Sequence, residues 1–156
     1  MLEEEIAQIL KERNLTISVA EACTSGLVSY RLTSVPGSSR YFVGGVLSYS
    51  NEVKEHILKI PKELMIKEGS VAEPTAIAMA RGVRQLLGTD IGLSTTGVMG
   101  PEGGTPSKPV GLFFVAVVGP GDKVCRQQHH FQGERDANRV AASEAALKLL
   151  KSVLSE

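Results

Sequence analysis

Residues 17–34 read ISVAEACTSGLVSYRLTS, a short apolar run followed by small polar residues and then by a second periodic segment. The run at 17–20 predicts a buried β-strand, because a short apolar run before turn-forming residues is typical of one. Residues 21–26 predict a turn from this strand into a helix, which should end before Val35-Pro36-Gly37, since proline cannot continue a helix. A strand that passes directly into a helix is typical of α/β proteins.

The rest of the chain repeats this alternation on both sides of the quoted stretch. Further strands are predicted at 42–50, 91–96, 110–118 and 123–131. Helices are predicted from Leu2 to about Asn14, behind an N-cap at Asn51, between Pro61 and Gly69, between Pro74 and Gly88, and from about Arg135 to Leu154. Because the last two strands are joined by a tight turn, the sheet should be mixed. We therefore expect a single α/β domain over residues 1–156, with a mixed sheet in a three-layer α/β/α arrangement.

Composition limits the classes of partner. The chain has 156 residues, a common size for one domain, and its 17 Lys+Arg equal its 17 Asp+Glu. A chain without net charge has no global field to hold a polyanion, so no nucleic-acid partner is expected. No apolar stretch approaches the roughly 20 residues that cross a bilayer, and the N-terminus begins with acidic residues, unlike a signal peptide. We expect a cytoplasmic protein without a membrane partner.

Four loop segments follow predicted strands and combine small residues with polar ones. α/β sheets place their ligands at such strand ends. The segments are EACTSG at 21–26, YSNEVK at 49–54, TGVMGPEGG at 96–104 and FQGER at 131–135.

The first segment has two interpretations. Thr24, Ser25 and Gly26 lead into a helix whose free backbone N–H groups could hold an anion, but the same residues could form an ordinary cap, which is commoner. Cys23 is expected to be a small buried residue rather than a nucleophile, because the sequence offers no evident histidine partner. With only Cys125 besides it, neither a disulfide framework nor a four-ligand zinc site is predicted.

The second segment contains a candidate general base. Lys54 would lie in the first turn of a helix, where the positive end of the helix dipole disfavours its charged form. Partial burial would add to that effect, and the Tyr49 hydroxyl could then orient or relay a proton. The alternative is a solvated lysine and a packed tyrosine, which is the commoner situation for these residue types.

The last two segments could bind an anion. Glycines at 97, 100, 103 and 104 allow a close approach of the backbone, although a plain connecting loop would have the same composition. Arg135 and Arg139 lie one turn apart at a helix start, which is unfavourable for a cation unless an anion is bound or nearby acidic residues balance it. The adjacent His129 and His130 should point to opposite faces of a strand, so no shared metal is predicted.

Taken together, in this order and spacing, these segments resemble the CinA C-terminal domain family, which includes stand-alone nicotinamide-nucleotide amidases. The resemblance runs from about Ser18 to Leu150 and rests on AEACTSG, VPGSSRYFVGGVLSYSNEVK, the AEP at 72–74, TTGVMGPEGGTPSKPVG and FQGERDANR. It implies hydrolysis of the carboxamide of nicotinamide mononucleotide to the nicotinate nucleotide and ammonia, without a metal or other cofactor. It also implies a homodimer or larger oligomer.

The resemblance also implies roles for single residues. Family members typically read E-S-C-T-G-G where this chain reads EACTSG, so Ala22 stands at the position of the nucleophilic serine. In the family a lysine matching Lys54 would take the serine's proton, and residues matching Tyr49 and Thr96 would assist. The residues expected to hold the substrate are Thr24, Ser25, Gly26, Asn51, Gly97, Gly100, Gly103, Gly104, Lys108, Arg135 and Arg139.

Three functional hypotheses remain open from the sequence. The first is an amidase in which Thr24 or Ser25 replaces the missing serine, or in which serine belongs at position 22. The second is a catalytically silent module that binds pyridine nucleotides. The third is a purely structural oligomerisation module that binds no nucleotide.

Overall fold

A five-stranded mixed sheet lies at the centre of the computed structural model, which describes residues 1–156. The strand order is β2-β1-β3-β4-β5. β1 pairs in parallel with β2 and β3. β4 pairs antiparallel with β3 on one side and with β5 on the other. The predicted mixed sheet is therefore confirmed. The strands are β1 Ile17–Glu21, β2 Phe42–Leu47, β3 Ile91–Gly97, β4 Leu112–Val118 and β5 Val124–His130.

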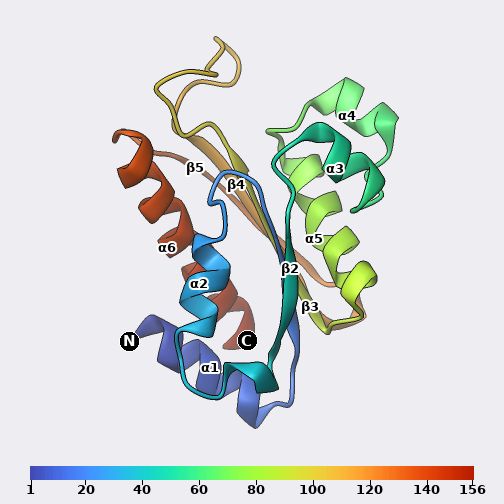
Figure 1. The fold of residues 1–156 in the computed structure, drawn as a ribbon, viewed down its shortest axis with the longest axis vertical. Helices are drawn as coiled ribbons and strands as arrows, with labels where there is room; N and C mark the ends of the chain where they lie inside the picture. The colour runs from blue at the N-terminus through green and yellow to red at the C-terminus, as the bar shows by residue number, and fades with distance from the viewer.

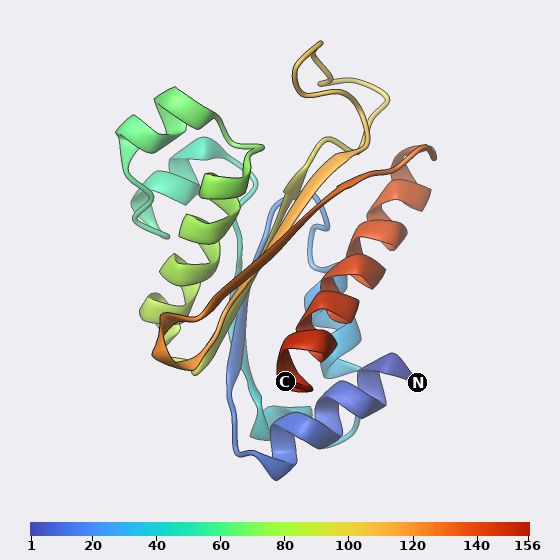
Figure 2. The same ribbon diagram turned by 180° about the vertical axis from the view of Figure 1, so that it is seen from behind.

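Helices cover both faces of this sheet, which confirms the three-layer arrangement (Figures 1 and 2). One layer holds α1 (Leu2–Glu12), α2 (Leu27–Thr33) and α6 (Arg135–Leu154), and the other holds α3 (Asn51–His56), α4 (Lys62–Glu68) and α5 (Glu73–Leu87). Short 3-10 turns at Ser38–Arg40 and Pro120–Asp122 complete the connections. None of the helices is long and apolar enough to cross a membrane.

Alternate strand residues supply the two cores. Val19 and Leu93 pack towards α1, α2 and α6, while Ala20 packs with Met79 and Val83 of α5. Because successive side chains of a strand point to opposite faces, residues 18, 20 and 22 face the α5 layer. β4 is buried along its whole length, since it lies inside the sheet with helices over both faces.

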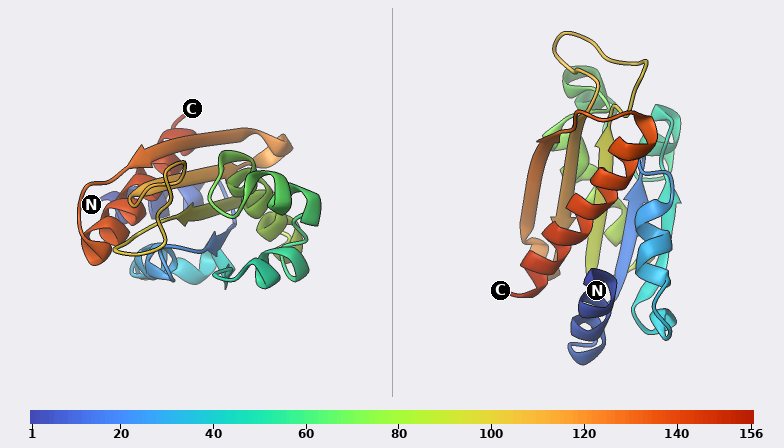
Figure 3. Two further views of the ribbon diagram at one scale, coloured as in Figure 1. Left: turned by 90° about the horizontal axis from the view of Figure 1, so that it is seen from above. Right: turned by 90° about the vertical axis from the view of Figure 1, so that its left-hand side faces the viewer.

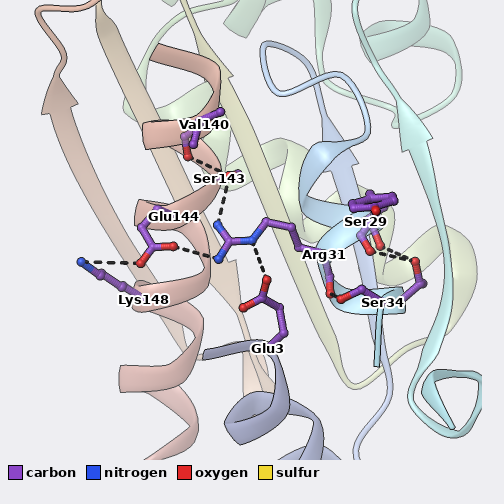
Figure 4. Close-up of polar contacts among 10 residues, drawn as sticks. Glu3, Ser29, Arg31, Ser34, Val140, Ser143, Glu144 and Lys148 are labelled. Carbon is purple, nitrogen blue, oxygen red and sulfur yellow. Dashed lines mark hydrogen bonds and ion pairs between the residues drawn. The ribbon is translucent and has the colours of Figure 1, made fainter. Parts of the chain in front are cut away.

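Arg31 joins the three helices of the first layer at one point (Figure 4). From α2 it donates to Glu3 of α1 at 2.9 Å and to Glu144 of α6 at 2.8 Å, and it also contacts Ser143 at 3.2 Å. The hydrogen bond from Arg31 holds the pKa of the Glu3 carboxyl below its ordinary value. This junction fixes α2 relative to α6, the helix that carries Arg135 and Arg139.

The segment after β2 differs from the sequence expectation. The strand ends at Leu47 rather than at residue 50, because the chain turns into α3. The N-cap of α3 is Ser50, whose hydroxyl accepts a hydrogen bond from Val53 N at 3.1 Å. The prediction of Asn51 as the cap is therefore wrong: Asn51 is the first helical residue, because Ser50 already has the extended backbone that a cap requires.

Candidate active site

A cavity of about 260 Å³ is lined by residues that lie at or just after the carboxyl ends of β1, β2 and β3. At this end of the sheet, the long loop that joins β3 to β4 extends beyond the strands (Figure 3). All four sequence segments contribute to the lining of the cavity. Ala22, Lys54 and Thr96 are buried in it, whereas Tyr49 and Arg135 are exposed at its rim. The lining residues named from the sequence are Ala22, Cys23, Tyr49, Lys54, Thr96, Gly97, Gly100, Gly103, Arg135 and Arg139.

Ala22 and Thr96 lie side by side on the same face of the sheet. The parallel register pairs Glu21 with Thr95, and Ala22 N donates to Thr95 O at 3.1 Å, so the pairing continues to Ala22 and Thr96. The Thr96 hydroxyl donates to Ser70 O at 2.7 Å. Ala22 presents only a methyl group, so position 22 has no side-chain oxygen to offer a substrate.

Lys54 is the buried cation of the site. Its side chain is only 2% exposed, and Nζ donates to the backbone oxygen of Tyr49 at 3.1 Å. Burial lowers the pKa of Lys54 to about 8, since the charged form loses its hydration. The lysine is therefore buried rather than solvated, and its neutral, basic form is far more populated near neutral pH than that of an ordinary lysine.

Tyr49 contributes in two ways. Its backbone oxygen holds Lys54, while its side chain lies at the rim, where the hydroxyl is 3.4 Å from Arg135 Nη2. The expected contact of the tyrosine hydroxyl with the lysine is not formed in this structure. The hydroxyl instead lies beside a cation that lines the same cavity.

Cys23 is a buried thiol that lines the cavity. The thiol is buried, and burial raises its pKa to about 12, so it stays protonated at physiological pH. Its backbone oxygen accepts a hydrogen bond from Arg139 Nε at 3.0 Å. The expectation of a small buried residue agrees with this position.

Arg135 and Arg139 bring positive charge to the cavity from the first two turns of α6. Arg135 Nη1 donates to Gly100 O at 2.8 Å, which attaches the helix to the glycine-rich loop. Arg139 Nε donates a hydrogen bond to Cys23 O, so the two Nη groups of its guanidinium remain available to bind a ligand. Two guanidinium groups beside one small cavity suit a phosphate or carboxylate.

Asn138, which the sequence analysis did not single out, does not line the cavity but binds two segments beside it. The side chain is buried, its Nδ2 donates to Met99 O at 2.9 Å, and its Oδ1 accepts from Gly133 N at 2.9 Å. It therefore fixes the glycine-rich loop to the start of α6. The sequence does hold one indication of this role: Asn138 is a polar residue between Arg135 and Arg139, on a helix expected to pack against the sheet. Ser70, Val71 and Glu102 do line the cavity and were not foreseen.

The CinA C-terminal domain model matches residues 1–154 of the chain. The chain belongs to the CinA C-terminal domain family. It is 46% identical over 153 residues to a putative competence-damage inducible protein of Desulforudis audaxviator, covering 98% of this chain and 37% of that protein. A CinA-like protein of Syntrophus aciditrophicus is 46% identical over 154 residues, with 99% and 37% covered. The chain thus spans about 37% of the length of these curated relatives.

Solved structures of CinA proteins have the same fold. The competence damage-inducible protein A of Klebsiella pneumoniae superposes with a TM-score of 0.95 at 28% identity, covering 99% of this chain and 96% of that one. A competence/damage inducible protein of Agrobacterium tumefaciens gives a TM-score of 0.93 at 31% identity, with the same coverage. This chain therefore has the fold of these solved CinA proteins.

Within this CinA-type fold, the Glu21 side chain occupies the amino end of α2, the helix that follows β1. The Glu21 carboxylate accepts hydrogen bonds from the backbone N–H groups of Gly26, Val28 and Ser29 at 3.2, 2.9 and 2.9 Å. Thr24 is buried and donates to the same carboxylate at 2.6 Å. Of the two interpretations of this segment, the structure favours the cap, and the capping group is Glu21. Thr24, Ser25 and Gly26 do not line the cavity.

Three further residues expected at the CinA site also lie outside the cavity. Lys108 Nζ donates to Val71 O and, at 2.7 Å, to Glu68 O, and it lines a separate hollow with His130. Asn51 and Gly104 are exposed and do not line the main cavity. The positive charge at the cavity therefore comes from Lys54 and α6 rather than from Lys108.

Proposed function

We propose that this cavity is a nicotinamide-nucleotide amidase site, which hydrolyses the carboxamide of nicotinamide mononucleotide to nicotinate mononucleotide and ammonia. The observation that carries the proposal is Lys54, a buried lysine with a pKa of about 8 in the same small cavity as Ala22 and two arginines. A lysine in that state suits a general base for a neighbouring hydroxyl. Arg135 and Arg139 suit the phosphate of the nucleotide.

The chemistry needs an attacking oxygen at position 22. A serine there would give its proton to Lys54 while its Oγ attacks the carboxamide carbon, and Lys54 would return the proton to the leaving ammonia. Water would then release the acyl group by the same route. Thr24 and Ser25 do not line the cavity, so neither is placed to replace that serine. We therefore expect the chain with Ala22 to bind the nucleotide and to turn it over slowly at most.

Ala22→Ser tests the proposal directly. The variant should release ammonia from nicotinamide mononucleotide at a rate several orders of magnitude above the parent, because a nucleophile and its base act as a unit. Lys54→Ala in the Ala22→Ser background should abolish the gain. Ammonia release by purified protein is the measurement. The proposal fails if Ala22→Ser binds the nucleotide but stays at background.

Binding of the phosphate is tested separately. Arg135→Ala should weaken nicotinamide mononucleotide binding by about 1.5–3 kcal/mol, the value of a hydrogen bond to a charged group. Lys148→Ala is the matched control, since Lys148 is an exposed cation of the same helix that pairs with Glu144 and does not line the cavity. Isothermal titration calorimetry gives both dissociation constants. If Arg135→Ala and Arg139→Ala each bind as the parent does, the arginines do not hold the phosphate.

A catalytically silent pyridine-nucleotide-binding module is the second candidate, and the methyl group of Ala22 favours it. Its signature is tight nicotinamide mononucleotide binding without ammonia release, in the parent and in Ala22→Ser alike. A purely structural module would bind no nucleotide in either form. Calorimetry beside the ammonia assay separates the three functions.

A further inference from the structure

The Ser48 hydroxyl is the one buried side-chain polar atom in the molecule that has no hydrogen-bond partner. Ser48 is fully buried at the carboxyl end of β2. Other buried hydroxyls are paired: Ser18 contacts Thr89 at 2.7 Å, and Ser94 donates to Ala76 O. An unpaired buried hydroxyl lowers stability, so its place in the fold calls for an explanation.

Ser48 lies directly beside Ala22. The register of β1 and β2 pairs Glu21 with Leu47, and Ser48 N donates to Glu21 O at 2.9 Å, so the next pair is Ala22 and Ser48. Paired residues of parallel strands point to the same face of a sheet. Thr96 flanks Ala22 on its other side. The three strands therefore form one row of side chains, with hydroxyls at both ends and a methyl group in the middle.

Position 22 is the neighbour of Ser48 on the adjacent strand. Ser48 does not line the cavity, although Ala22 does, so a molecule in the cavity meets Ala22 and not Ser48. Side chains opposite one another in a sheet have Cβ atoms about 5 Å apart, which lets two hydroxyls reach hydrogen-bond distance. A serine at position 22 is placed to pair with Ser48.

We propose that Ser48 is a positioning residue whose hydroxyl holds a serine hydroxyl at position 22 in its reactive orientation. Alanine at position 22 leaves this partner unpaired. The pairing itself is a structural claim, whereas its consequence for turnover rests on the amidase proposal. In the Ala22→Ser chain, Ser48 would fix one rotamer of the serine without touching the substrate itself.

The first test is a double-mutant cycle on stability. Ser48→Ala in the parent should leave the unfolding midpoint unchanged or raise it, because it removes an unpaired hydroxyl. In the Ala22→Ser background the same change should lower the midpoint, because it removes a partner. Ser94→Ala is the matched control: it should lower the midpoint equally in both backgrounds. Equal effects of Ser48→Ala in both backgrounds would overturn the pairing.

The second test is kinetic. In the Ala22→Ser background, Ser48→Ala should reduce kcat on the order of 10- to 100-fold while KM stays unchanged, since only the orientation of the nucleophile is lost. Ser48→Thr keeps the hydroxyl and should restore most of kcat. An unchanged kcat for Ser48→Ala would overturn the positioning role. A third outcome separates the two proposals. If Ser48→Ala changes the unfolding midpoint differently in the two backgrounds but Ala22→Ser releases no ammonia, the pairing is supported and the amidase proposal is refuted.

Discussion

At the scale of the residue, Lys54 shows how burial prepares a base. The sequence interpretation relied on the helix dipole and on partial burial, and the structure assigns the lowered pKa to burial. α3 has only six residues and carries Lys54 in its fourth position, so the helix is short for a strong dipole. The position of Lys54 after a predicted strand indicates a candidate base. How deeply its side chain is buried depends on packing between distant segments, which the sequence does not show.

The pKa of Lys54 predicts a specific pH dependence of stability. Its value in the folded chain is about 8, below the ordinary 10.5, so between these pH values the unfolded chain holds a proton that the folded chain has released. The free energy of unfolding should therefore rise with pH across this window, by about 3 kcal/mol in total. Lys54→Met should lack this rise. Urea unfolding of both proteins from pH 7 to 10.5 measures the difference, and a constant difference would show that Lys54 titrates normally.

At the scale of the element, Glu21 shapes the entry to α2. The sequence of this turn predicted a helix start but not its capping group, because a carboxylate on the strand itself reaches forward to the N–H groups of the next helix. Sequence rules expect the cap at the residue directly before the helix, which here is Gly26. The real cap lies five residues earlier in the chain and is visible only once the turn is built.

Glu21→Ala should lower the free energy of unfolding by about 3 kcal/mol or more, because it leaves several buried donors without an acceptor. The matched control is Glu12→Ala on α1, an exposed carboxylate that accepts only from Gln8, with an expected change within about 0.5 kcal/mol. Chemical denaturation gives both values. A loss of similar size in the two variants would contradict the assigned role of Glu21.

At the scale of the whole molecule, the surface indicates where a second copy could bind. The alanines of α6 are small enough to permit close packing against a neighbour, but Ala142, Ala145 and Ala146 are buried in the chain's own core. Among the exposed apolar side chains, Val43 and Leu47 lie together on the edge strand β2, and Tyr30 lies on α2. The opposite edge strand, β5, exposes polar side chains instead.

We expect a homodimer that associates through the β2 edge, because an exposed apolar edge strand favours pairing with another chain. Light scattering at micromolar concentration should give twice the mass of one chain. Val43→Lys should reduce this to one chain, whereas Ile66→Lys, an equally apolar and exposed residue on α4, should not. A monomer mass for the parent protein would rule the dimer out.

The order of elements was largely predictable, because turn residues and apolar periodicity are local. The sheet, the terminal hairpin and α6 follow from them. What the sequence did not show depends on contacts across the fold. Asn138 binds Met99 O of a distant loop, and Lys108 binds the backbone oxygens of residues 68 and 71 instead of lining the cavity. The unpaired hydroxyl of Ser48 can be interpreted only once the sheet places it beside Ala22.

The Glu21 carboxylate also affects how binding should respond to salt. Because it fills the amino end of α2, that end offers no place to sulfate or to a nucleotide phosphate. The attraction for an anion then comes from guanidinium groups such as Arg135, which is exposed to the surrounding ions. Salt screens such an attraction over about 8 Å at physiological ionic strength. Affinity for the mononucleotide should therefore fall as ionic strength rises, because the anionic phosphate supplies the attraction to these guanidinium groups.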